Sequence, residues 1–243
     1  MNKLSVDEVL RFSWEAYKKN WQALTMALLV VLVASFIPSV LVQALKNSPL
    51  LAALLSLISW VISMVVSLGM VKVALGVTDG RAAEVGELFF ALKDLKLVLK
   101  YVATSLVSGF AVFLAVIPMM ILYFLPAFIW GGRAGGEVIS LVLALAYLPV
   151  LIYVAVRLSY WVYVLVDQRK WGSEALRISW NVTKGKVLLI IAFGVVLALI
   201  NVAGAILLLL GLVVTLPMTF IAIARIYRIL EAGSASNFSV VAS

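Results

Sequence analysis

Three basic residues inside long apolar stretches are the side chains of this sequence with the clearest potential for chemistry. They are Lys72, Arg157 and Arg225, each a few residues before the end of its stretch. Ammonium and guanidinium groups donate hydrogen bonds to phosphate oxygens, so the three cations together would form a site for a phospholipid headgroup or another anion. Single cations near the ends of apolar helices also act as anchors that reach the water, which is the commoner role. The sequence leaves both interpretations open.

Other common catalytic groups are missing from the sequence. The 243 residues include no histidine and no cysteine, which excludes disulfides, thiolate nucleophiles, histidine bases and the usual zinc and haem ligand sets. The eleven carboxylates fall in expected surface helices, in loops or at the ends of apolar stretches, without the cluster that a metal-dependent enzyme or a proton relay needs. We therefore predict a protein that is not an enzyme and binds no metal or cofactor.

The composition indicates that lipid surrounds most of the chain. Apolar residues make up 65% of the sequence and charged residues 12%, against about 25% charged in soluble domains. Stretches long enough to cross a bilayer lie at residues 22–45, 50–71, 97–125 and 138–166. A further stretch, residues 187–230, is long enough to cross twice, with a turn expected near Gly211. The predicted fold is an all-α polytopic membrane protein with six transmembrane helices.

Basic residues determine the predicted orientation. Of the 19 lysines and arginines, all but Lys46 and Arg133 fall on one side of the six expected spans. Because the basic side of a membrane protein faces the cytoplasm, we predict a cell-membrane protein with both termini cytoplasmic. The net charge of +8 then faces anionic headgroups, so no nucleic-acid partner is required.

An internal repeat precedes the outward-going spans. The segment EVLRFSW, from Glu8 to Trp14, matches EALRISW, from Glu174 to Trp180, and a weaker copy starts at Gly86. Residues 5–21 form an amphipathic pattern, and Ser5 followed by Glu8 is a capping-box signal for its start. We predict three parallel repeats, each an amphipathic surface helix followed by a transmembrane hairpin, at about residues 5–77, 81–166 and 171–230. They form a single domain, 1–231, followed by a flexible tail, 232–243.

Tryptophans mark the expected membrane interface. Indole rings prefer the headgroup level, where one edge is apolar and the other polar. The predicted interface anchors are Trp14, Trp21, Trp161, Trp171 and Trp180.

The strings VRLSYWVYVLVDQRKWGSEALRISWNVTKGK and LGLVVTLPMTFIAIARIYRIL carry a resemblance. The chain resembles a large group of bacterial and archaeal six-helix membrane proteins of unknown function. These are similar to the membrane domain fused to some glycerophosphodiester phosphodiesterases. The resemblance implies the six-helix fold and little chemistry, because the catalytic domain of those fusions has no counterpart here.

Two functional classes remain after these exclusions. The first is a non-enzymatic membrane protein that organises or assists partners, or binds lipid, through its three amphipathic helices. Its expected partners are anionic phospholipid of the inner leaflet, and either another membrane protein or a second copy of the chain. The alternative is a small permease or lipid-translocating protein with proline-kinked helices, whose path follows the serine stripe Ser56, Ser59, Ser63 and Ser67. Packing between helices would explain the same serines, and Asn201 would satisfy backbone at a bend.

Overall fold

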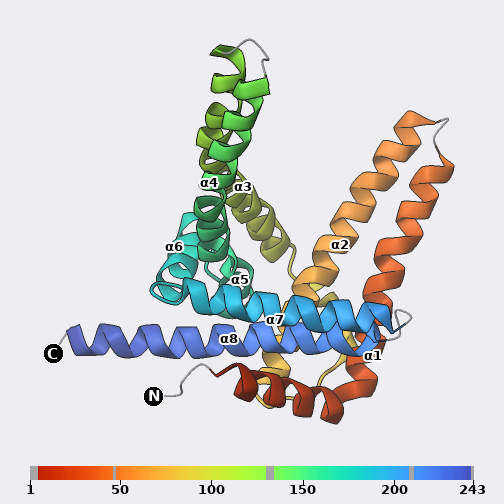
Figure 1. Cartoon of the computed structure of the whole chain (residues 1–243). Helices are drawn as coiled ribbons and strands as arrows, with labels where there is room; N and C mark the ends of the chain where they lie inside the picture. Colours follow the sequence, from red (N-terminus) through yellow and green to blue (C-terminus); the bar gives the residue numbers. More distant parts are fainter. Residues whose placement is uncertain (1–4, 46–47, 130–133, 208–210, 242–243) are drawn as a thin grey trace.

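The computed structural model describes residues 5–45, 48–129, 134–207 and 211–241, and these residues form helices without any strand (Figure 1). Six helical segments in the described ranges are long and apolar enough to cross a membrane. This confirms the predicted all-α, multi-pass class. The elements are α1 (Val6–Ala44), α2 (Pro49–Thr78), the 3₁₀ helix η1 (Val85–Lys93), α3 (Leu95–Ile129), α4 (Ala134–Leu158), α5 (Trp161–Gln168), α6 (Gly172–Val182), α7 (Val187–Ile206) and α8 (Leu212–Val241).

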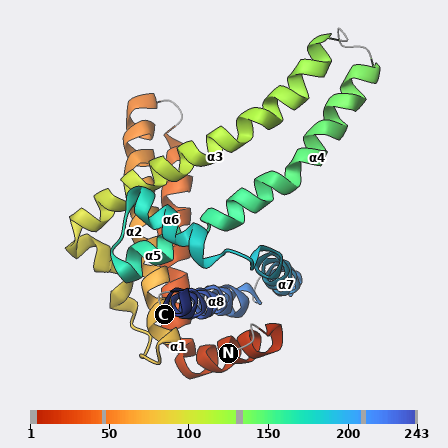
Figure 2. The same cartoon turned by 90° about the vertical axis from the view of Figure 1, so that its left-hand side faces the viewer.

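The long helices pair into three hairpins, α1 with α2, α3 with α4 and α7 with α8 (Figures 1 and 2). The first two hairpins rise from a common base and diverge, whereas α7 and α8 lie across that base. The third hairpin is not aligned with the other two. Its helix α8 packs against α1 and α2 at the base. The hairpin turn lies near Gly211 as expected, and a Cβ on Gly211 would lie 2.6 Å from the Cα of Gly204.

A kink divides α1 where the sequence pattern changes. Asn20 has non-helical backbone angles (φ −119°, ψ 19°), so the amphipathic part of α1 runs in a different direction from the apolar part that follows (Figure 1). The Asn20 side chain bonds the Ala16 carbonyl at 3.0 Å and accepts a hydrogen bond from the Ala83 amide at 3.0 Å. Ser5 occupies the predicted N-cap position, but its side chain makes no capping hydrogen bond.

The predicted fourth span, residues 138–166, is not one helix. α4 ends at Leu158 and α5 begins at Trp161. The stretch Gly136–Gln168 as a whole is long and apolar enough to cross a membrane, so the fourth apolar span is confirmed. At the break between its two helices, α6 supplies hydrogen bonds, as described below. The segment predicted as the middle surface helix is the 3₁₀ helix η1. Its backbone at Leu88 lies against Gly69 of α2, so closely that any side chain at position 69 would collide with it.

Buried side chains concentrate at the common base, where α1, α2, η1, α5 and α8 meet. Large members of this core include Leu68, Leu88, Leu165, Ile221 and Tyr227. The outer parts of the first two hairpins instead expose apolar side chains such as Phe36, Leu50, Phe110 and Phe128, as expected of surfaces that face lipid. At the other end, α8 continues to Val241, into the segment predicted to be a tail, and its side chains from residue 235 onward are outside the described part.

Candidate functional site

Each of the three predicted site cations lies over an aromatic ring from a different surface segment. Lys72 Nζ of α2 is 4.4 Å from the ring centre of Phe90 in η1. The guanidinium carbon of Arg157 in α4 is 4.4 Å from the Trp180 ring of α6. The guanidinium carbon of Arg225 in α8 is 4.6 Å from the Phe12 ring of α1. No described contact gives the three cations a shared partner.

Arg157 is the most deeply buried of the three cations, at 3% exposed. Besides Trp180, the Tyr153 ring lies 5.6 Å from its guanidinium carbon, and the two rings meet edge to face with centres 6.0 Å apart. A desolvated cation–π contact contributes about 2 kcal/mol, but it occupies no N–H donor. The Nε and Nη1 atoms of Arg157 are buried and have no hydrogen-bond partner among the described residues.

Ser179 positions the Arg157 turn, a role that the sequence analysis did not predict. Its hydroxyl donates to the Arg157 carbonyl at 2.9 Å and accepts from the Tyr160 amide at 3.1 Å. One side chain of α6 therefore satisfies two backbone groups that the break between α4 and α5 leaves without helical partners. The only available signal was the position of Ser179 in the repeated segment, where Ser13 is its counterpart.

An apolar groove of about 390 Å³ lies beside this turn, between α3, α4 and α6. Its lining residues are Ala111, Ala115, Val154, Leu158, Leu176, Arg177 and Trp180. Trp180 belongs both to the groove wall and to the aromatic surroundings of Arg157. Arg177 is exposed and is the one charged residue of the lining.

Lys72 has more complete partners than Arg157. Its Nζ lies 3.6 Å from a carboxylate oxygen of Glu87 in addition to the Phe90 ring. Arg225 stacks on Phe12, which lines a shallow depression of about 280 Å³ together with Arg11 and the three carboxylates of Asp7, Glu8 and Glu15. The surroundings of the three cations therefore differ in charge.

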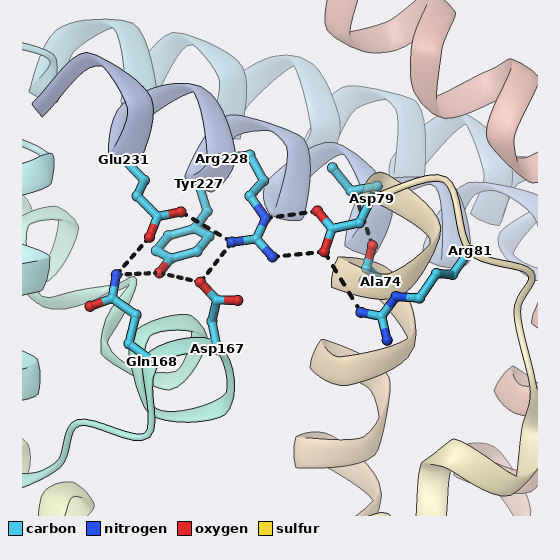
Figure 3. Close-up of polar contacts among 9 residues, drawn as sticks. Ala74, Asp79, Arg81, Asp167, Gln168, Tyr227, Arg228 and Glu231 are labelled. Atoms are coloured by element: carbon cyan, nitrogen blue, oxygen red, sulfur yellow. Dashed lines mark hydrogen bonds and ion pairs between the residues drawn. The ribbon is translucent and has the colours of Figure 1, made fainter. Parts of the chain in front are cut away.

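A second polar cluster joins the cytoplasmic ends predicted for the inward-going spans (Figure 3). Arg228 of α8 bonds both carboxylate oxygens of Asp79, at 2.9 and 2.8 Å. It also donates to Asp167 at 2.6 Å and to Glu231 at 3.1 Å. Tyr227 donates to Asp167 at 3.2 Å, and Gln168 links Tyr227 and Glu231 through contacts of 3.2 and 2.7 Å.

The Arg228 cluster brings together carboxylates that lie far apart in the sequence. Asp79 follows α2, Asp167 lies in α5 and Glu231 lies in α8, so the fold collects one carboxylate from each of three distant segments. Within the described residues, no group of histidine, cysteine and acidic side chains could hold a metal ion. The cluster's carboxylates are compensated by the guanidinium instead, an arrangement that holds helix ends together.

The predicted tryptophan anchors differ in their surroundings. Trp14, Trp21, Trp171 and Trp180 are exposed, while Trp161 is half-buried with its ring 5.1 Å from the Tyr101 ring. On the first surface segment, the face toward the protein is formed by Val9, Ser13 and Tyr17, all buried. The exposed indoles are thus free to meet lipid on the other side of that segment.

The serine stripe of α2 includes exposed serines and serines that bond their own helix. Ser56 and Ser67 are exposed, and the hydroxyls of Ser56 and Ser59 bond carbonyls of their own helix at 2.7 and 2.6 Å. Asn201 was expected to satisfy backbone at a bend, but it bonds the Thr219 hydroxyl at 3.0 Å and so ties α7 to α8.

Comparison with known proteins adds no further assignment to these observations. The chain matches no protein-family model, no curated protein and no solved structure.

Proposed function

We propose that this chain is a non-enzymatic integral membrane protein that binds lipid, or organises and assists partners, at the cytoplasmic leaflet. Three amphipathic segments form the binding surface: residues 5–20, 85–93 and 172–182. In this proposal both termini are cytoplasmic, and the three segments begin three related repeats of the chain. The ligands are membrane lipids, with anionic phospholipid preferred.

The observation that carries the proposal is the stacking of one cation on each surface segment. Lys72 of the first repeat contacts the segment that begins the second repeat, and Arg157 of the second repeat contacts the segment that begins the third. Arg225 of the third repeat contacts the segment that begins the first. A molecule bound on a surface segment would therefore lie next to a positive charge from a spanning helix. Where no carboxylate neutralises it, a cation at the headgroup level attracts anionic lipid by about 1 kcal/mol.

Equivalent positions support the relation between the repeats. When the three repeated segments are aligned, Ser13, Ala91 and Ser179 correspond, and all three are fully buried. Phe12 and Phe90 correspond in the same way, and both carry a stacked cation. Small buried residues let each segment approach the protein closely while its tryptophans or other large apolar residues remain exposed.

Replacing two exposed tryptophans with alanine tests the proposal. We expect the double variant Trp14→Ala, Trp180→Ala to insert normally and to retain less anionic phospholipid or partner protein during purification in mild detergent, because both indoles lie at the proposed binding surface. Trp60→Ala is the matched control, since Trp60 is equally exposed but lies within α2, away from the surface segments. Native mass spectrometry would measure the retained lipids and chains. Full retention by the double variant would show that the segments are only connectors.

A further inference from the structure

We propose that the groove between α3, α4 and α6 binds one anionic phospholipid, with its phosphate at Arg157 and Arg177 and an acyl chain along the apolar walls. This inference rests on the proposed function and names a ligand class and a site for it.

The guanidinium of Arg157 defines the charge of the ligand. An arginine remains protonated in proteins, and burying its charge without a hydrogen-bonded partner is costly. At 3% exposure, Arg157 has two ring faces against it and two N–H-bearing atoms, Nε and Nη1, without a partner among the described residues. These two N–H groups point along different edges of the planar guanidinium, so each is a separate donor for a phosphate oxygen.

The groove beside Arg157 defines the rest of the ligand. Val154 and Leu158 precede and follow Arg157 on α4, and both line the groove together with the Trp180 ring. Ala111 and Ala115 lie one turn apart on α3, so their small side chains leave the space between the helices open. The groove has a volume of about 390 Å³ and is open along one side. Walls of this kind favour a hydrocarbon chain.

Arg177 is the cation that lines the groove, and Arg157 lies beside it through Trp180, whose ring belongs to the groove wall and also stacks on Arg157. Arg177 is exposed, and it forms no ion pair with any residue of the described ranges, so its charge is free to attract an anion. Figure 2 shows α6, which carries Arg177 and Trp180, beside the bases of α3 and α4. The arrangement combines one guanidinium in the lining, and a second beside it, with an apolar channel. An amphiphile with a phosphate head uses both, whereas inorganic phosphate would leave the channel unused.

The other two predicted cations lack this combination. Lys72 already faces the carboxylate of Glu87. Arg225 stacks on Phe12, beside a depression whose three carboxylates outnumber its single arginine and would repel an anion. We therefore infer one phospholipid site at Arg157 rather than one site shared by the three cations.

The experiment uses the full chain purified in mild detergent, with phosphatidylglycerol and phosphatidylcholine added in turn and bound lipid counted by native mass spectrometry. We expect the parent protein to prefer phosphatidylglycerol, and Arg157→Gln to weaken that binding about tenfold, as loss of a charge-assisted hydrogen bond does. Ala115→Leu should weaken it similarly by filling the groove while every charge remains. An excess of inorganic phosphate should not displace the lipid.

Two matched variants serve as controls. Arg225→Gln removes the same charge from another apolar helix, and Ala146→Leu enlarges an exposed alanine of α4 outside the groove. Both should bind phosphatidylglycerol like the parent. If Arg157→Gln does not fold, Ala115→Leu decides the question alone.

Three results would overturn the inference. Parental affinity in both Arg157→Gln and Ala115→Leu, with a parent that still prefers phosphatidylglycerol, would reject this site and leave the proposed function intact. A parent without any preference for phosphatidylglycerol would reject both the site and lipid selectivity. Displacement of the lipid by inorganic phosphate would indicate a simple anion site.

Discussion

Arg157 and Arg228 illustrate how surroundings give one residue type two different roles. Arg228 is about a quarter exposed and bonds carboxylates of three segments, so each of its three guanidinium nitrogens donates within the protein. Arg157 is almost fully buried between two rings, and part of its guanidinium is unpartnered among the described residues. The first residue therefore ties helix ends together, and the second belongs to the proposed lipid site.

The role of Arg228 leads to a stability prediction. Arg228→Gln leaves Asp79, Asp167 and Glu231 close together without their cation. Removing one partner of a fully buried pair costs about 3–5 kcal/mol, and partial exposure reduces this, so we expect a loss of about 1–3 kcal/mol. Arg81→Gln is the control, because Arg81 is 57% exposed and reaches Asp79 only at 3.6 Å. Unfolding in detergent micelles would measure both free energies.

A second substitution distinguishes lost attraction from general disruption. Adding Asp167→Asn to the Arg228→Gln variant removes one of the repelling carboxylates, so part of the lost stability should return. Equal stability of the Arg228→Gln and Arg81→Gln variants would contradict the structural role of the cluster.

Among the elements, the broken fourth span depends on a side chain that another element supplies. The break between α4 and α5 includes no glycine or proline. The Ser179 hydroxyl of α6 bonds both the Tyr160 amide and the Arg157 carbonyl at this break. Ser13 occupies the corresponding place in the first repeated segment, and it is buried as well, but its hydroxyl bonds only the Val9 carbonyl of its own helix, at 2.8 Å.

These two serines form a matched pair of variants. Ser179→Ala leaves the Arg157 carbonyl and the Tyr160 amide without partners, which should cost about 1–3 kcal/mol of unfolding free energy. Ser13→Ala should change the free energy little, because the Val9 carbonyl keeps its place in a regular helix. Amide hydrogen exchange at residues 158–161 should accelerate in the first variant alone. Equal effects of the two substitutions would mean that Ser179 contributes only by its packing.

Local patterns predicted the elements better than they predicted the contacts between them. The change from an amphipathic to an apolar pattern near residue 21 matches the kink at Asn20, and apolar length gave all six long helices. The α4–α5 break was missed because its cause lies in α6, and the Arg228 cluster was missed because its partner Asp79 is 149 residues away. The form of η1 depends on its close contact with Gly69, which no local pattern reveals.

For the whole molecule, the arrangement of the hairpins bears on how many of them cross the membrane. The α1–α2 and α3–α4 hairpins diverge from a common base, and the α7–α8 hairpin lies across it (Figure 1). All three have the length and apolar character that crossing requires. The basic residues predict that the base of the first two hairpins faces the cytoplasm.

Cysteine labelling tests this topology directly, because the chain has no cysteine of its own. We expect single cysteines at positions 133 and 207 to react with an impermeant reagent outside intact cells, and cysteines at positions 81 and 170 to react only after the cells are opened. Position 133 is outside the described residues, whereas Leu207 is exposed at the end of α7. The reverse pattern would contradict the orientation. Labelling at 133 without labelling at 207 would indicate four spans, with the third hairpin on the inner surface.

The Arg228 cluster also has a consequence for the order in which the chain is synthesised and folded. A ribosome makes Asp79 and Asp167 before it reaches Arg228, and the 149 residues between Asp79 and Arg228 take roughly 7 to 30 s at about 5–20 residues per second. During that interval the first two hairpins are inserted, yet both carboxylates still lack the guanidinium that pairs them in the finished fold. Because α8 is made after the first two hairpins and joins them through Arg228, a chain stalled before α8 would present the cell's quality-control proteases with two loosely joined hairpins.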